Sequence, residues 1–420
     1  MKRRLTAVLT VWLALSVLAA CGNPQVFSEG ETLSASRQRN QDSAVTYNYA
    51  DGAQEPPKAY TSYAGSVTDF ALRQLRYRAQ QDSGSFVFSP AAASLQTALL
   101  ANAASKDTRQ ELLLALGGGA LTLDDLNACS SYFKSRMETV GRSDQKEADA
   151  AGVAFNGAML LDDSVDVRSA FLQTNADYYG YDVFRFAYHG ENAAQKLQHY
   201  LQPYTSDGSL ACNGSLNFVS ACTLHDTWLE ASADAAEGTF RGAGKTEALP
   251  YFTSNAKLLH SGKTTGVLKY TAATPLKLLV ALPDDGKAFD SWAESFDAAA
   301  LNGLLDSMDI TKTAAVTLPA ISVAGDGTAV ADDRLTNSGL FSLFSGKAGF
   351  SALSYTENAA MGSFYEINAA FTLDRNGVNT TTAAPAATPA DGEAFTVDRP
   401  FLFFLLDNES NIPVLAGCYR

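Results

Sequence analysis

The sequence contains few of the residues from which common catalytic and metal sites are built. Its 420 residues include four histidines and five cysteines, and the metal-binding patterns HExxH and CxxC are absent. The nucleophile motif GxSxG and the phosphate-binding patterns GxGxxG and GxxxxGKS/T are absent as well. We therefore predict that the chain is not an enzyme and that it uses no metal ion or cofactor.

Positive charge is also scarce. The chain has 31 Lys and Arg residues against 45 Asp and Glu residues, for a formal net charge of −14, and no basic stripe interleaved with aromatic residues occurs. This balance argues against nucleic acid, so we predict no nucleic-acid partner. A mean hydropathy of −0.07 argues against a protein with many membrane spans. The hydrophobic fraction of 46% predicts a folded globular protein.

The amino terminus has the pattern of an export signal. Basic residues at positions 2–4 precede an apolar run from Leu5 to Ala20, which is short for a spanning helix of roughly 20 residues. The small residues before Cys21 resemble a bacterial lipobox. We predict a lipoprotein signal peptide over residues 1–20 and lipid attachment at Cys21, which would place the protein outside the cytoplasm, anchored to the bacterial cell membrane or secreted. The alternative is an ordinary secretion signal with a chance cysteine.

A single folded domain is expected after the signal. Residues 21–65 are rich in Ser, Gln and Asn and predict a flexible tether, whereas no later break in composition divides residues 66–420. Helical and strand patterns follow in mixed order without a repeat, which predicts the α+β class. We expect helices from Val67 and over 91–104, 108–116 and 166–179, and strands over 86–88, 151–161, 218–228 and 276–283.

Four cysteines remain in the mature chain. Their compartment permits disulfides, and four thiols allow three pairings, but buried free thiols are an equal alternative. The spacing does not choose among these possibilities for Cys129, Cys212, Cys222 and Cys418.

Several separated segments, in order, resemble the serpins, the family of serine protease inhibitors. Residues 395–405, with the sequence FTVDRPFLFFL, resemble the carboxyl-terminal signature of that family. Residues 88–90 and 108–112 resemble its second and third helices, residues 279–284 resemble a later strand, and residues 218–228 resemble the long central strand that ends at the tryptophan of the breach, here Trp228. The resemblance implies a serpin fold of three β-sheets with about eight or nine helices and an exposed reactive-centre loop.

The hinge of that loop is implied at Gly377, followed by Val378, Asn379, Thr380, Thr381 and Thr382. Without the family, the Thr/Ala/Pro-rich stretch that follows reads as a linker or exposed loop. With the family, Val378, Thr380 and Thr382 begin an uncharged alternating face suited to burial as a new strand. Departures from the family pattern include Arg375 and Asn376 where acidic residues are usual, Val378 where threonine is usual, and Pro385 farther along. Ala92, Ser220 and Ile367 align with a Ser/Asn/His cluster under the family's main sheet.

The resemblance also implies a scissile bond near residue 391. Counting from the hinge indicates Asp391–Gly392, and counting back from Pro400 indicates an earlier bond such as Ala390–Asp391. The implied function is a monomeric suicide inhibitor whose covalent target is a serine or cysteine protease. The alternatives are a serpin-fold surface lipoprotein that only binds a partner and, less in keeping with the missing motifs, an enzyme.

Overall fold

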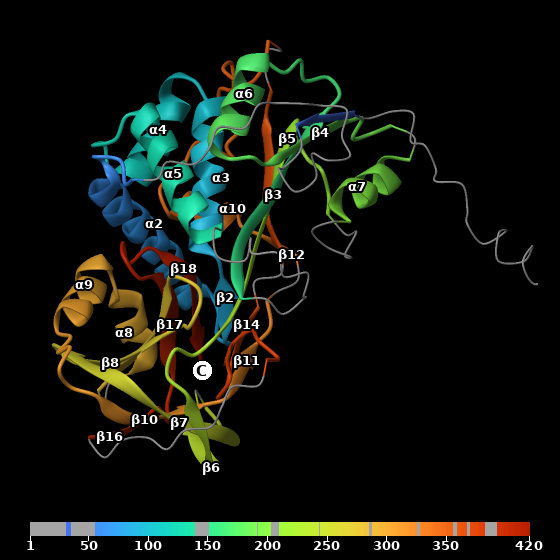
Figure 1. Cartoon of the computed structure of the whole chain (residues 1–420). Helices are drawn as coiled ribbons and strands as arrows, with labels where there is room; N and C mark the ends of the chain where they lie inside the picture. Colours follow the sequence, from blue (N-terminus) through green and yellow to red (C-terminus); the bar gives the residue numbers. More distant parts are fainter. Residues whose placement is uncertain are drawn as a thin grey trace, which may run out of the picture.

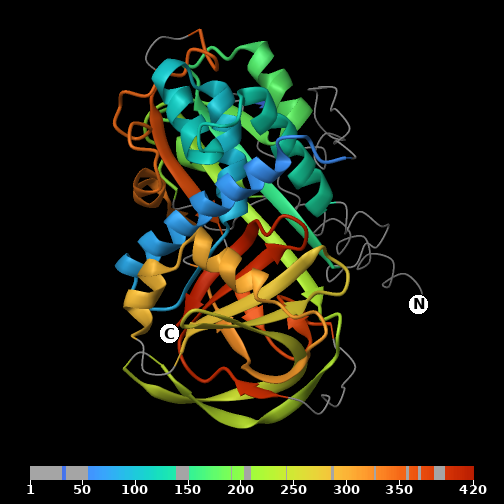
Figure 2. The same ribbon diagram turned by 90° about the vertical axis from the view of Figure 1, so that its left-hand side faces the viewer.

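The computed structural model describes residues 31–34, 55–138, 151–190, 192–202, 210–242, 244–284, 288–325, 328–355, 359–367, 370–382 and 393–420. Within these residues nine helices and eighteen strands build the fold. Helices α3 to α6 gather at one end of the molecule, and strands β6, β7, β10 and β16 lie at the other (Figure 1). The same division is visible from the side (Figure 2).

Local sequence explains where several helices begin and end. Ser89 caps α3, because its side chain accepts a hydrogen bond from the backbone N–H of Ala92, and Pro90 occupies the first turn. Gly118 ends α4 in the left-handed conformation at φ +57°, which glycine adopts without a steric cost. The helices are α2 Tyr60–Gln81, α3 Pro90–Ala103, α4 Lys106–Gly117, α5 Leu123–Glu138, α6 Ser169–Tyr178, α7 Ala193–Leu201, α8 Phe289–Ser295, α9 Ala298–Asp306 and α10 Asp332–Asn337.

One of the two nine-stranded sheets, called the main sheet here, runs through the middle of the molecule. Its main path has the order β1-β4-β3-β5-β15-β14-β11, and β13 pairs with both β5 and β12. The strands are β1 Glu31–Ser34, β3 Gly152–Asp162, β4 Asp182–Phe186, β5 Leu216–Thr227, β11 Ile321–Val323, β12 Thr328–Val330, β13 Met361–Ile367, β14 Phe371–Leu373 and β15 Gly377–Val378. Helix α7 lies on one face of this sheet, and helices α3 and α5 lie on the other (Figure 1).

The other two predicted sheets share one long strand. Strand β7 pairs with β6 and β10 through its first part and with β8 through its last part, from Lys257 to Ser261. The two predicted sheets are therefore one continuous sheet, with the strand order β16-β10-β7-β8-β9-β17-β18-β2. Its strands are β2 Phe86–Phe88, β6 Ser232–Arg241, β7 Thr246–Ser261, β8 Thr264–Tyr270, β9 Leu276–Pro283, β10 Ala314–Pro319, β16 Ala394–Thr396, β17 Phe401–Asp407 and β18 Pro413–Tyr419.

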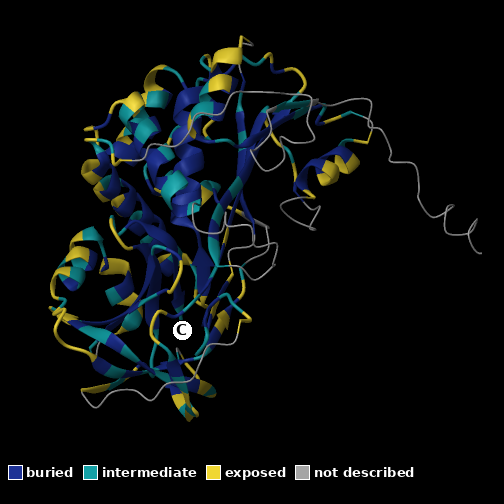
Figure 3. Cartoon of the chain, viewed as in Figure 1, coloured by how far each residue is buried: buried dark blue, intermediate teal, exposed yellow. Residues whose placement is uncertain are grey.

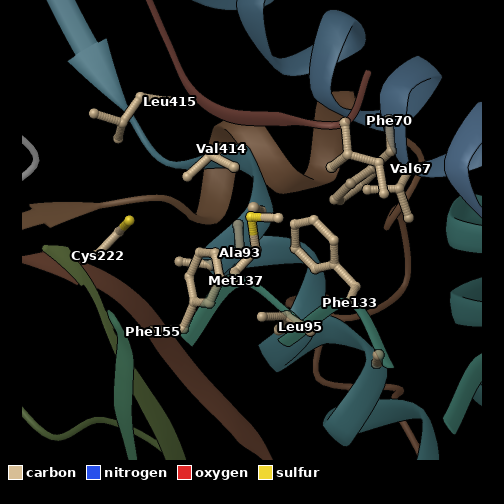
Figure 4. Packing of buried hydrophobic residues seen from close by; sticks show 14 of the residues in the cluster. Val67, Phe70, Ala93, Leu95, Phe133, Met137, Phe155, Cys222, Val414 and Leu415 are labelled. Carbon is tan, nitrogen blue, oxygen red and sulfur yellow. The ribbon is translucent and has the colours of Figure 1, made fainter. Parts of the chain in front are cut away.

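The core lies between the helices and the sheets. Every residue of α3 and of β17 is buried. Strand β17 is apolar up to Asp407, and the polar residues Ser94 and Thr97 of α3 donate to backbone carbonyls one turn earlier in the helix. Val67 and Phe70 of α2 pack with Phe133 of α5 and Phe155 of β3 in this core (Figure 4). Burial is concentrated on the inner faces of the helices and along the strands, and exposure on the outer turns (Figure 3).

Two structured segments precede residue 66, where composition predicts that the folded domain begins. Helix α2 begins at Tyr60, with Tyr60 and Tyr63 buried, so the boundary predicted at residue 66 falls inside a helix. Residues 31–34, which belong to the predicted tether, pair antiparallel with β4 as an edge strand. Composition missed both segments because each is held by contacts with distant parts of the chain. No helix in the described ranges is long and apolar enough to span a membrane.

Candidate functional site

The start of the predicted hinge is already a strand in the middle of the main sheet. Strand β15, Gly377–Val378, lies between β5 and β14 and is antiparallel to both. Gly377 pairs with Thr227, and Val378 pairs with Asp226 on one side and with Leu373 on the other.

The same sheet is closed at its other end. There β13 pairs directly with β5 in parallel, with Phe364 opposite Phe218 and Ile367 opposite Ala221. Strand β5, which flanks the hinge, is therefore paired farther along with β13, the strand that precedes β14 in the chain. A longer hinge strand, antiparallel to both, could grow only if β5 and β13 separated.

Trp228 lies beside the hinge, where the resemblance places the breach. It is only 4% exposed. Its backbone N–H donates to the carbonyl of Asn376 at 3.2 Å, and its indole Nε1–H donates to the carbonyl of Asp374 at 2.8 Å. The Asp374 carboxylate accepts from the backbone N–H groups of Asn376 and Gly377, which closes the turn between β14 and β15. Trp228 thus holds both ends of this turn.

Close packing explains why two hinge residues have the types they have. A Cβ atom added to Gly377 would lie 2.0 Å from the carbonyl oxygen of Asp226, so only glycine fits between the flanking strands. Val378 is fully buried in the main core cluster. The next residue, Asn379, has φ +50° and turns the chain out of the sheet, and Thr381 and Thr382 are exposed. Two of the six predicted hinge residues are therefore in the sheet.

A buried lysine packs against the breach tryptophan. The Lys269 ammonium lies 5.1 Å from the centroid of the Trp228 ring and donates to the carbonyl of Glu230 at 2.8 Å and to the Ser254 hydroxyl. Burial lowers the pKa of Lys269 to about 8, and the nearby charge of Glu230 opposes this shift. The native fold therefore favours the neutral amine more than the unfolded chain does.

Replacing Lys269 by methionine should change the pH dependence of stability. Between pH 8 and the ordinary lysine pKa of about 10.4, the unfolded chain binds more protons at this position than the native protein, so the wild-type stability contribution rises with pH. We measure the unfolding free energy of Lys269→Met and of the wild type by urea denaturation. We expect the difference, variant minus wild type, to be about 1–3 kcal/mol larger at pH 7 than at pH 10. Lys312→Met, at a side chain that is 83% exposed, is the control. A pH-independent gap for Lys269→Met would contradict the burial argument.

The cluster predicted under the sheet is not assembled as the alignment implied. Ala92 packs in the main core on the helix side of the sheet, whereas Ile367 packs in a separate cluster with residues of α7 on the other face. Ser220 is opposite Glu366, not Ile367, and its hydroxyl oxygen has no hydrogen-bond partner among the described residues. The alignment was off by one residue in β13, and a shift of one residue moves a side chain to the opposite face of a sheet.

Glu366 instead belongs to a buried polar group that sequence reasoning missed. Its carboxylate accepts from Arg334 of α10 at 2.8 Å, and both side chains are less than 10% exposed. The Arg334 guanidinium also donates to Gln74 of α2 at 3.0 Å and lies 4.7 Å from the Phe88 ring centroid. No local pattern marks these residues, because they come from four different elements of the chain.

The other predicted site residues are the scissile-bond candidates and the lipid attachment residue. The scissile-bond candidates Ala390, Asp391 and Gly392, and the lipid attachment residue Cys21, lie outside the described residues. After the loop, β16 pairs parallel with β10 in the second sheet.

The four remaining cysteines are free thiols, so the structure does not use any of the three possible pairings. Burial raises the pKa of each thiol, to about 12 for Cys129, Cys212 and Cys222 and to about 11 for Cys418. Across the described ranges, no group of three or more His, Cys, Asp or Glu side chains could hold a metal ion.

A family model described as Serpin (serine protease inhibitor) matches residues 65–420. The chain belongs to the serpin family. Iripin-3 of Ixodes ricinus is 22% identical over 374 residues, which cover 83% of this chain and 92% of that protein. Serpin A11 of Mus musculus is 28% identical over 128 residues, so this chain spans only 28% of that relative's length.

Solved serpin structures share the fold. The native state of tengpin, a thermophilic serpin, superposes with a TM-score of 0.72 at 19% identity and covers 92% of this chain and 98% of its own. Human thyroxine-binding globulin in complex with thyroxine gives a TM-score of 0.69 at 17% identity, and the match covers 85% of this chain and 98% of that protein's chain. The predicted α+β serpin fold is thus confirmed. At these identities the likeness establishes the architecture, and the serpin family as a whole consists generally of protease inhibitors.

Proposed function

We propose that this serpin inhibits serine proteases as a suicide substrate. The observation that carries the proposal is the position of Gly377–Val378, which already form a strand between β5 and β14 at one end of the main sheet. The start of the hinge therefore lies, before any cleavage, in line with a new central strand that would form once β5 and β13 separate. Its next residues are uncharged, so burial would not place a charge in the core.

The free energy for inhibition would come from completing that strand. Each new backbone hydrogen bond contributes about 1 kcal/mol net, so a dozen would supply roughly 10 kcal/mol. The uncut loop cannot insert fully because its far end is held by β16 in the second sheet. Cleavage would remove that restraint, so the intact fold would hold free energy that one cut releases.

The chemistry itself belongs to the protease. Its nucleophilic serine, or cysteine in a related target, attacks the carbonyl carbon of Ala390 or Asp391, and the amine of the following residue leaves. An acyl-enzyme ester or thioester results. Insertion of the hinge side of the loop would carry the attached protease along and distort its site before water hydrolyses the acyl bond. A small-pocket protease would suit cleavage after Ala390, and an acid-preferring protease would suit cleavage after Asp391.

We further propose that the protein acts as a monomer at the outside of a bacterial membrane, held by a lipid on Cys21. The basic start, the apolar run and the small residues before Cys21 support this location. A diacylglycerol on this cysteine would partition into the bilayer with about 0.8 kcal/mol per buried methylene. Acyl groups released from the purified mature protein, and their loss in Cys21→Ser, are the measurement that tests the anchor.

A panel of proteases tests the inhibitory function directly. The protein is mixed with subtilisin-like, elastase-like and acid-preferring serine proteases and with papain-like cysteine proteases, and the products are separated by SDS gel electrophoresis. We expect an SDS-stable complex with at least one protease. Mass spectrometry should locate its covalent bond at residue 390 or 391. Only nicked protein and fully active protease across the panel would contradict the proposal.

A second candidate is a binding module without inhibitory activity. Human thyroxine-binding globulin, a structural neighbour, binds thyroxine in the compared structure, and the hinge here carries Arg375 and Asn376 where acidic residues are usual. Under this alternative the loop would be cut without forming a complex. The same protease panel therefore separates the two candidates.

A further inference from the structure

The chain leaves the main sheet abruptly at Asn379. Its φ of +50° lies in the left-handed region, which few residues other than glycine adopt and which asparagine tolerates better than most. Residues on both sides have ordinary strand or loop conformations, and Val378 immediately before it is fully buried in the sheet. The hinge strand therefore ends at one specific residue and not by gradual fraying.

The side chain of Asn379 binds the edge of β14 that a longer hinge strand would use. Its Oδ1 accepts from the backbone N–H of Thr372 at 2.6 Å and from the Thr372 hydroxyl at 3.2 Å. Its Nδ2–H donates to the carbonyl of Ala370 at 3.0 Å. The amide thus satisfies both a donor and an acceptor of the neighbouring backbone.

These contacts replace two bonds of a regular antiparallel ladder. The backbone N–H of Asn379 donates to the carbonyl of Thr372 at 3.0 Å, as the ladder requires. In a regular ladder the Thr372 N–H would donate in return to the Asn379 carbonyl, and the Ala370 carbonyl would accept from the Thr381 N–H. The left-handed turn directs the Asn379 carbonyl elsewhere, and the side-chain amide occupies both positions.

We propose that Asn379 is a positioning residue that stops the hinge strand after Val378 and sets the rate at which the rest of the loop enters the sheet. This inference rests on the proposed inhibitory function. To extend the strand, Asn379 must rotate to an extended backbone and release the three side-chain hydrogen bonds before the backbone bonds form. Because the inserted strand regains those bonds, the amide raises the barrier to insertion and leaves the stability of the inserted state almost unchanged.

The rate of insertion matters because it competes with hydrolysis. If the loop enters slowly, water cleaves the acyl-enzyme and the inhibitor is consumed as a substrate. If the loop enters quickly, the protease is trapped. Asn379 would therefore decide how many inhibitor molecules are used for each protease inactivated, without touching the protease or the scissile bond.

Three variants separate the amide from the backbone turn. Asn379→Ala removes both the amide and the preference for the left-handed region, whereas Asn379→Gly keeps access to that region and removes the amide alone. Asn411→Ala is the matched control, because Asn411 is also left-handed, at φ +60°, but lies between β17 and β18, away from the hinge.

The first measurement uses the uncut protein and needs no inhibition. Hydrogen exchange at the Thr372 amide should be faster in Asn379→Ala and Asn379→Gly than in the wild type and in Asn411→Ala. Unchanged exchange at Thr372 in both Asn379 variants would overturn the assignment of the amide.

The second measurement follows insertion after cleavage with excess subtilisin, using the fluorescence of Trp228, which contacts the hinge turn. We expect Asn379→Ala and Asn379→Gly to insert about tenfold faster, equivalent to about 1.4 kcal/mol in the barrier, and to need fewer molecules per protease inactivated. An insertion phase equal in wild type and both variants would overturn this inference alone. Acceleration in Asn379→Ala but not in Asn379→Gly would assign the rate to the backbone turn and overturn the role of the amide. Absence of any insertion phase in the wild type would overturn the proposed function itself and this inference with it.

Discussion

Cleavage of the chain within residues 386–392 is expected to raise the melting temperature by roughly 20 °C or more. The cut frees the hinge side of the loop from β16, and extension of β15 between β5 and β13 would then add about a dozen ladder bonds, worth roughly 10 kcal/mol. Differential scanning calorimetry of intact and nicked protein measures the effect, and mass spectrometry confirms the position of the cut.

A nick outside the loop is not expected to have this consequence, because it would leave the loop held between β15 and β16. Intact protein and nicked protein that melt at the same temperature would show that the loop stays outside. The inhibitory mechanism would then be wrong although the serpin fold would stand. Because the chain is acidic, intact and nicked protein should be compared at the same salt concentration, so that charge repulsion affects both samples equally.

Val378→Arg is expected to convert the inhibitor into a substrate. Val378 is fully buried between β5 and β14, and an unpaired guanidinium there would cost several kcal/mol, so the hinge strand would be expelled and insertion would stall. We expect the number of inhibitor molecules needed for each protease inactivated to rise at least tenfold, which corresponds to about 1.4 kcal/mol. Titration of protease activity and the ratio of complex to nicked chain on SDS gels measure this outcome.

Two controls make the comparison specific to burial. Thr381→Arg places the same charge three residues later, at an exposed position that would face away from the core in an inserted strand. Val378→Thr keeps a small uncharged side chain at the buried position. Both should retain inhibition, and nicked Val378→Arg should lack the thermal shift of the nicked wild type. Full inhibition by Val378→Arg would contradict the assignment of Gly377–Val378 as the entering strand.

Much of the architecture was predictable from local patterns. The strands over 86–88 and 276–283 have the predicted bounds, and α3 at Pro90–Ala103 is within one residue of the predicted 91–104. Continuous apolar runs, capping residues and glycine stops act over a few residues, so they can be recognised without knowing the fold. The start of α2 was missed because Tyr60 and Tyr63 are aromatic residues in a polar stretch, and their burial depends on the core they join.

The candidate site was only partly predictable. Gly377 and Trp228 could be placed from the family pattern, but that pattern put Ile367 where the structure puts Glu366. A register error of one residue is invisible in an alignment of low similarity and reverses which face a side chain occupies. The roles of Asn379 and Arg334 had no sequence signal, because neither residue is unusual in its local context.

By itself, the sequence determined the α+β class, the family, the export pattern of the amino terminus and the uncharged composition of the loop. The family follows from the resemblance of several segments to the serpin pattern, and the others follow from residue types and short-range spacing, which every conformation of the chain shares. Only the tertiary structure decided that two hinge residues lie inside the main sheet, that the amide of Asn379 binds the edge beyond them, and that the four thiols stay apart. Those facts depend on which backbone groups of distant segments face one another, and hydrogen bonds of this kind exist only once the sheet has formed.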